Sequence, residues 1–179
     1  VIRHDARDDI EIKLNKDNSS SFEHWFHFCL DTEHTSVPHT FKLSGLKDSA
    51  YPDAWEGYHA VASTDRETWF RLESSYSDGT LEIQYTPDTQ FTWIAYFAPY
   101  SYERHLDLIA WAQSQFLCEA EYLGATLDGR DMTLLKVGIE DGQKQKVWIT
   151  ARQHPGETMA EWFVEGFLER LLDDDDAVS

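Results

Sequence analysis

The stretch ITARQHPGET, Ile149 to Thr158, joins a strand-like apolar run to an amphipathic helix. Pro155 fixes its own φ and disfavours a helical His154, so the helix cannot easily begin before the turn. Gly156 permits a tight bend, and Glu157 then stands at the helix start. An imidazole nitrogen and a carboxylate oxygen that reach one point suit zinc. The spacing alone leaves a second interpretation open, in which His154 caps or hydrogen-bonds the loop.

The second half of the chain is predicted to contain both helices and strands. Ser101 is the expected N-cap of a helix over residues 103–117, because apolar residues recur there at helical spacing. The Asp-Gly pair at 128–129 favours a hairpin. The apolar pattern therefore predicts strands over 120–126, 132–139 and 146–151, and a last helix over 158–172.

The first half reads as strands alone. Ile10, Ile12 and Leu14 alternate with polar residues, which is the pattern of a half-buried strand. Residues 22–30 are apolar on both faces and predict a central strand. With turn formers between the runs, the pattern predicts seven short strands and an antiparallel sandwich: 9–15, 22–30, 40–46, 57–64, 67–73, 80–86 and 91–97.

The pattern changes at Pro99, which divides the chain into two expected domains. Residues 1–99 would form the N-terminal β-sandwich. Residues 100–179 would form the first strands and helices of an α/β domain, and the fold class expected for the whole chain is α+β.

Composition excludes several classes of function. Thirty-three acidic against fifteen basic residues give a formal net charge of −18, which argues against nucleic acid and anionic membranes as partners. No apolar run is long enough to span a membrane. Cys29 and Cys118 lie in separate apolar segments and are expected to be free, buried thiols, although one disulfide stays open. The start at Val1 leaves the true N-terminus undetermined.

Other polar residues were weighed as site candidates. His24 and His27 are an odd number apart on a predicted strand, so they would face opposite sides and could not chelate one ion together. We expect structural roles for His24, His27, His34, His39, His59 and His105.

Two arginines and a row of glutamates also receive plain interpretations. Arg130 and Arg152 are candidate anion binders, but turn stability and a surface ion pair are the simpler explanations, and we assign neither arginine to the site. Glu161, Glu165 and Glu169 follow one another at intervals of four, which is typical of a solvated helix face.

Residues 151–172, ARQHPGETMAEWFVEGFLERLL, resemble the zinc-binding signature of the metallocarboxypeptidases, in the form used by the cytosolic carboxypeptidase subfamily. Residues 122–138 resemble the hairpin that leads into the same site. Residues 97–112 resemble the junction between that subfamily's N-terminal β-domain and its catalytic domain.

The resemblance implies a cytoplasmic peptidase with one zinc ion, in which His154 and Glu157 are the first two metal ligands. The expected substrate is the C-terminus of a peptide or protein, hydrolysed through a metal-activated water. The family's third ligand, carboxylate-binding arginine and general base all lie further downstream. The 179 residues are therefore expected to be an incomplete and inactive fragment; side-chain preference and oligomeric state stay open.

Two alternatives remain. Zinc deacylases of the succinylglutamate and aspartate type share H-x-x-E on a similar scaffold, but Pro155 replaces their glycine and they lack the large β-domain. The other alternative is an inactive β-sandwich docking module, since two ligands leave zinc under-coordinated.

Overall fold

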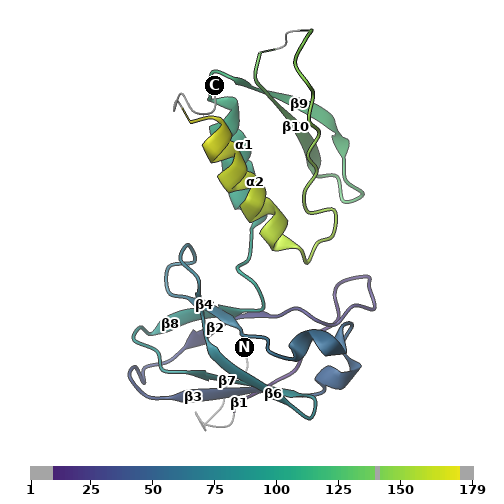
Figure 1. The fold of residues 1–179 in the computed structure, drawn as a ribbon. Coiled ribbons are helices and arrows are strands. Elements are labelled where there is room, and N and C mark those ends of the chain that lie inside the picture. The colour runs from purple at the N-terminus through teal and green to yellow at the C-terminus, as the bar shows by residue number, and fades with distance from the viewer. Residues whose placement is uncertain (1–9, 140–141, 174–179) are drawn as a thin grey trace. The chain divides into compact units, whose positions relative to one another are not determined.

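The computed structural model describes residues 10–139 and 142–173, which divide into two compact units, residues 1–99 and 100–179. The first unit is built almost entirely of strands, and the second combines two α-helices with a hairpin (Figure 1). The predicted α+β class is confirmed. Among the described residues, no helix has both the length and the apolar character that a membrane crossing requires.

Two four-stranded sheets form the first unit, with strand orders β1-β3-β7-β6 and β2-β8-β4-β5. The β1–β3 pair is parallel, whereas every other pair in these sheets is antiparallel, so the predicted sandwich is not purely antiparallel. The strands are β1 (Ile10–Ile12), β2 (His27–Asp31), β3 (His39–Leu43), β4 (Val61–Ser63), β5 (Phe70–Arg71), β6 (Glu73–Ser77), β7 (Thr80–Tyr85) and β8 (Phe91–Ala95).

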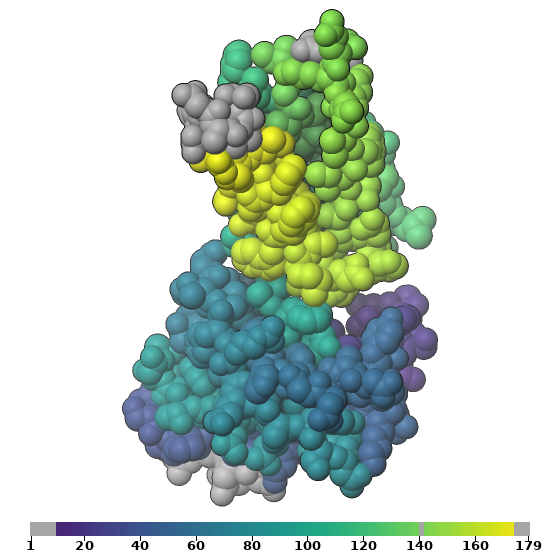
Figure 2. All heavy atoms as spheres, viewed as in Figure 1, coloured from purple at the N-terminus to yellow at the C-terminus, as the bar shows by residue number. Residues whose placement is uncertain are grey.

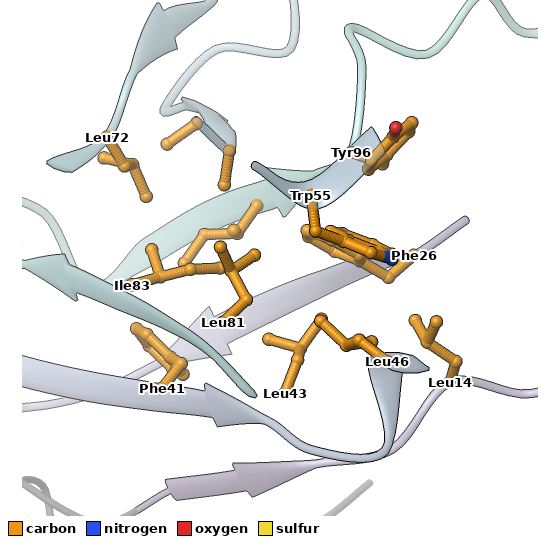
Figure 3. Packing of buried hydrophobic residues seen from close by; sticks show 13 residues of the cluster. Leu14, Phe26, Phe41, Leu43, Leu46, Trp55, Leu72, Leu81, Ile83 and Tyr96 are labelled. Atoms are coloured by element: carbon orange, nitrogen blue, oxygen red, sulfur yellow. The ribbon is translucent and has the colours of Figure 1, made fainter. Parts of the chain in front are cut away.

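Alternating side chains build the core between the sheets. Phe41 and Leu43 of β3 point inward opposite Ile83 and Leu81 of β7, and all four are almost completely buried. Ile94 of β8 joins the same cluster from the other sheet, which makes the unit a sandwich. Figure 3 shows the labelled side chains of this cluster gathered between the strands.

Two short 3₁₀ helices close one side of this core: η1 (Leu46–Asp48) and η2 (Pro52–Trp55). Trp55 is fully buried, and its indole N–H donates to the hydroxyl of Ser49 at 2.8 Å. That hydroxyl in turn donates to the Leu46 carbonyl at 2.8 Å. The buried indole is therefore anchored to the turn that follows η1.

The prediction of a central strand over residues 22–30 is wrong. β2 covers only its last part and lies at the edge of its sheet, paired with β8 alone. Phe26 enters the core from the irregular segment before β2, and its carbonyl accepts the Tyr96 N–H at 2.9 Å. The apolar pattern on both faces therefore arises because residues 22–26 lie outside the sheet and do not continue β2. Cys29, on the outer face of β2, is exposed rather than buried, and both cysteines are free.

The hairpin of β6 and β7 was also missed as a pair, because β6 is the polar segment ESSYS. Its turn places Asp78 and Gly79 at φ 51° and 81°, the left-handed conformations that a two-residue hairpin turn requires. The polar sequence of β6 suits an edge strand, where only one neighbour supplies packing.

The second unit contains α1 (Tyr102–Gln113), β9 (Cys118–Ala125), β10 (Asp131–Val137) and α2 (Thr158–Leu171). The predicted N-cap is confirmed, because the Ser101 hydroxyl accepts the Arg104 N–H at 3.1 Å. β9 and β10 pair as an antiparallel hairpin, and α1 contacts both this hairpin and α2.

The predicted strand over residues 146–151 is wrong. This segment is irregular, and Val147 and Trp148 are 81% and 68% exposed. A strand needs a neighbour for its backbone N–H and C=O groups, and no described strand pairs with this segment. Its apolar residues therefore lie open to solvent.

Candidate metal centre

The turn between the irregular segment and α2 carries His154 and Glu157. The Glu157 N–H donates to the His154 carbonyl at 3.0 Å, which brings the two residues together at the helix start. Both side chains are exposed, and the Glu157 carboxylate makes no capping bond to α2. Figure 2 shows atoms of the light-green segment that leads to this turn at the molecular surface. The second interpretation, a structural cap, therefore receives no support from the described contacts.

The residue with an unusual backbone conformation in this turn is Arg152, whereas the sequence predicts Gly156. Gly156 has no left-handed φ, and a Cβ built there would meet nothing within 4 Å, so the bend does not depend on glycine. Arg152 instead adopts a left-handed conformation with φ 54°. A non-glycine residue held in this region costs of order 1–3 kcal/mol, so the surrounding contacts must hold Arg152 in place.

Those contacts come from the Arg152 guanidinium. Its Nη1 donates to the Tyr100 carbonyl at 2.8 Å and also to the Glu161 carboxylate. Its Nε donates to the Pro155 carbonyl at 3.1 Å, inside the turn itself. One side chain thus connects the turn with the start of α1 and with α2.

Glu161 and Glu165 are not solvated, which corrects the predicted exposed row. Glu161 accepts hydrogen bonds from Arg152 and from His105 Nδ1, the latter at 3.1 Å. Burial alone would raise the pKa of Glu161, but these hydrogen bonds and positive neighbours outweigh it and lower that pKa. Only Glu169 fits the expected solvated position.

Glu165 holds α1 to α2 one turn further on. Arg104 donates to both carboxylate oxygens, from Nε at 2.9 Å and from Nη2 at 2.5 Å. The Tyr100 hydroxyl donates to the same carboxylate at 2.6 Å, and the Arg104 guanidinium stacks 4.2 Å from the Trp162 ring centre. The Arg104 hydrogen bond is the main cause that lowers the pKa of Glu165.

The contacts of Glu165 with Arg104 and Tyr100 form a clamp between α1 and α2. An open groove of about 270 Å³ borders this clamp but does not include the turn. It is lined by Arg104, Asp107, Leu108, Trp111, Glu165 and Glu169. The clamp was not predicted from the sequence. The signal was present as two glutamates four residues apart on one helix and the adjacent Arg104 and His105 on the other.

Several other candidate residues have structural contacts within their own unit. His24 Nε2 lies 3.0 Å from the Tyr96 hydroxyl, and burial lowers the pKa of His24. His39 and His59 contact backbone carbonyls of their own unit. Arg130 stacks on the Tyr102 ring at 4.3 Å.

His154 and Glu157 fit zinc by their chemistry. They offer an imidazole nitrogen and a carboxylate oxygen, both exposed and uncommitted among the described contacts. They do not complete a site, since within residues 10–139 and 142–173 no three His, Cys, Asp or Glu residues are grouped to hold an ion.

Two family models match the chain. The model described as the cytosolic carboxypeptidase N-terminal domain matches residues 1–97, and the zinc carboxypeptidase model matches residues 102–179. The second match contains α1, α2 and the whole His154–Glu157 turn.

Relatives match along nearly the whole chain. An uncharacterized protein of Zymomonas mobilis is 45% identical over 170 residues, which cover 95% of this chain and 44% of that protein. Cytosolic carboxypeptidase 2 of Danio rerio is 29% identical, over 84% of this chain and 25% of that protein. A metallo-carboxypeptidase from Pseudomonas aeruginosa, solved in complex with (2-guanidinoethylmercapto)succinic acid, is 41% identical with a TM-score of 0.90, over 99% of this chain and 47% of that one. The chain thus spans less than half the length of each of these relatives.

Proposed function

The chain belongs to the zinc carboxypeptidase family, in its cytosolic carboxypeptidase-like branch, and we propose that the intact protein uses one zinc ion to hydrolyse C-terminal residues from peptides or proteins. The proposal includes the two domains: residues 1–99 are the N-terminal β-sandwich, and residues 100–179 are the N-terminal part of the catalytic domain. The cytoplasm is the proposed location.

One observation carries the proposal. The segment that matches the zinc carboxypeptidase model contains a turn whose imidazole and carboxylate are exposed and make no competing contact among the described residues. Metal ligands need free lone pairs, and a side chain already bonded to the protein would have to give up that bond first. His154 and Glu157 meet this condition.

Each residue has a distinct part in the proposed reaction. His154 and Glu157 would hold the zinc, which when bound polarises a carbonyl and lowers the pKa of water toward neutrality. The turn keeps both ligands at the start of α2, where the Arg152–Glu161 contact fixes the chain. The third ligand, the carboxylate-binding arginine and the general base would come from sequence beyond residue 179, so the 179 residues alone should release no amino acid.

The ligand in the Pseudomonas aeruginosa complex is chemically consistent with this proposal. Its succinic acid part carries carboxylates, as a peptide C-terminus does. A related site in the intact protein would recognise the terminal carboxylate of its substrate. Side-chain preference is left open, since the groove beside α1 and α2 does not include the turn.

The test uses the full-length protein and its metal content. His154→Ala and Glu157→Ala are each expected to lose the zinc while the sandwich stays folded, because two remaining ligands hold the ion poorly. Gln153→Ala is the matched control, since Gln153 is exposed in the same turn and its side-chain amide donates to the Thr150 hydroxyl at 2.6 Å. Full zinc content in both ligand variants would remove the assignment. Release of amino acids from peptides, rather than of acyl groups from N-acylated amino acids, separates a peptidase from a deacylase.

A further inference from the structure

We propose that Arg152 is a positioning residue for the metal centre, because it holds the His154–Glu157 turn in place against the starts of both helices. This inference rests on the proposed function, in that His154 and Glu157 must be the ligands. Arg152 itself contacts neither the metal nor the substrate. It acts through the backbone that carries the ligands.

The geometry of its three acceptors supports this role. Arg152 Nε binds the Pro155 carbonyl at 3.1 Å, and Pro155 directly follows the ligand His154. Nη1 binds the Tyr100 carbonyl at 2.8 Å, one residue before the N-cap of α1. Together with Glu161, one turn into α2, these acceptors belong to three separate segments. A single planar group thus fixes the turn against the two helices that flank it.

The backbone of Arg152 gives a second, independent argument. Its φ of 54° is a conformation in which glycine is the cheapest residue, yet the chain places an arginine there. Gly156, four residues further along the chain, does not adopt a left-handed φ, although glycine could do so at little cost. The contacts of the arginine side chain to the turn and to the helix starts offset the cost of this backbone conformation.

Lysine could not replace this arginine. The guanidinium presents its donors in a rigid planar fork, so Nε and Nη1 can serve acceptors on different segments at once. An ammonium is a compact charge that would keep the Glu161 ion pair and lose at least one of the carbonyls. Arg152→Lys thus separates charge from geometry.

The effect should appear in metal binding. Residues that orient metal ligands typically account for about 10–100-fold in metal affinity when they are removed. We expect Arg152→Lys in the full-length protein to weaken zinc binding by about this factor, measured by competition with a chromophoric chelator. The cobalt-substituted variant should show shifted visible bands, because the ligand geometry around the ion changes.

Arg66→Lys is the matched control. Arg66 is also a left-handed arginine, with φ 67°, but it lies in the sandwich unit, near the Trp93 ring at 5.8 Å. Its replacement should leave zinc affinity and the cobalt spectrum unchanged. Glu161→Gln is a second variant, which removes the charge of the α2 acceptor and should weaken zinc several-fold.

The outcomes distinguish the inference from the function on which it rests. If His154→Ala loses zinc while Arg152→Lys and Glu161→Gln keep wild-type affinity and spectrum, the positioning role is overturned and the metal assignment stands. If His154→Ala keeps its zinc, the metal assignment itself fails. A lower melting temperature of metal-free Arg152→Lys, with unchanged affinity and cobalt bands, would show a purely structural role and also overturn the inference. Should Arg152→Lys not fold, unchanged zinc affinity of Glu161→Gln overturns it, and a several-fold loss supports it.

Discussion

Replacement of Glu165 by alanine should loosen α2 from α1 without disturbing the sandwich. The Glu165 carboxylate accepts from Arg104 Nε at 2.9 Å, from Arg104 Nη2 at 2.5 Å and from the Tyr100 hydroxyl at 2.6 Å. The side chains of Arg104 and Glu165 are 28% and 15% exposed. Glu165→Ala therefore leaves three donors without this acceptor in a place that water reaches only in part.

The magnitude follows from the kind of bond and its exposure. A hydrogen bond to a charged group contributes about 1.5–3 kcal/mol, and bonds that share one acceptor do not add fully. Because Arg104 can turn partly to water, solvent screening reduces the loss. We expect about 2 kcal/mol in the free energy of opening α2, which corresponds to a decrease of about 30-fold in hydrogen-exchange protection.

Hydrogen exchange of the α2 amides in the full-length protein measures this directly. Glu169→Ala is the control, because Glu169 is the next glutamate in the same row, is exposed, and makes the same change in helix propensity. It should alter protection of α2 only slightly, within about 0.5 kcal/mol. Equal loss of protection in Glu165→Ala and Glu169→Ala would refute the role of the clamp.

The contribution of Glu165 to the stability of α2 should also depend on pH. The pKa of Glu165 in the folded protein lies below its ordinary value, chiefly through Arg104. Its stabilising contribution is therefore fully present above the unfolded pKa, about 4.3, and is lost as the pH falls through the folded value. The difference in α2 protection between wild type and Glu165→Ala should shrink below about pH 4.

Two further predictions concern the sandwich. Ser49→Ala removes the acceptor of the buried Trp55 indole N–H and should destabilise the protein by about 1–3 kcal/mol in denaturant unfolding. The control Ser44→Ala loses an exposed hydrogen bond to Glu11 and should cost under about 0.5 kcal/mol. Similar losses in both variants would contradict the importance of the buried bond. Gly79→Ala should lower the melting temperature more than Gly57→Ala does. Both glycines have positive φ, but only at Gly79 would a Cβ meet a neighbour, Lys47 Cγ at 2.8 Å, so equal shifts would show that Lys47 moves aside.

Local patterns predicted the elements whose stability is local. The Ser101 cap was predictable because Ser101 directly precedes the helical apolar pattern, where a hydroxyl can accept from the first free N–H groups of the helix. The strands β3 and β7 were predictable because their alternation matches one buried face. The segment 146–151 is a strand-like apolar run without a neighbour in the described chain, and a sequence pattern alone cannot reveal whether a partner strand is present.

The turn that carries the proposed ligands was predictable from the sequence, and the contacts that support this turn were not. His154, Pro155 and Glu157 are adjacent in sequence, so their spacing indicates the turn. The contacts of Arg152 were not predictable, because its acceptors Tyr100 and Glu161 lie 52 and 9 residues away in the chain. A helical row of glutamates is compatible with solvent or with a basic neighbour, and only the packing of α1 on α2 decides between them.

Different forces stabilise each of the two units. In the sandwich, side chains such as Leu43 and Leu81 are completely buried, and each such burial contributes about 1.5–3 kcal/mol without involving a group that titrates. In the second unit, large apolar side chains such as Trp148 and Phe163 stay exposed, while Arg104 and Arg152 join the helices through charged hydrogen bonds. Charged contacts weaken when a carboxylate is protonated or salt screens it. The His154–Glu157 turn is thus supported by polar contacts, and the proposed orientation of its ligands would depend on the donors that hold it rather than on a surrounding apolar core.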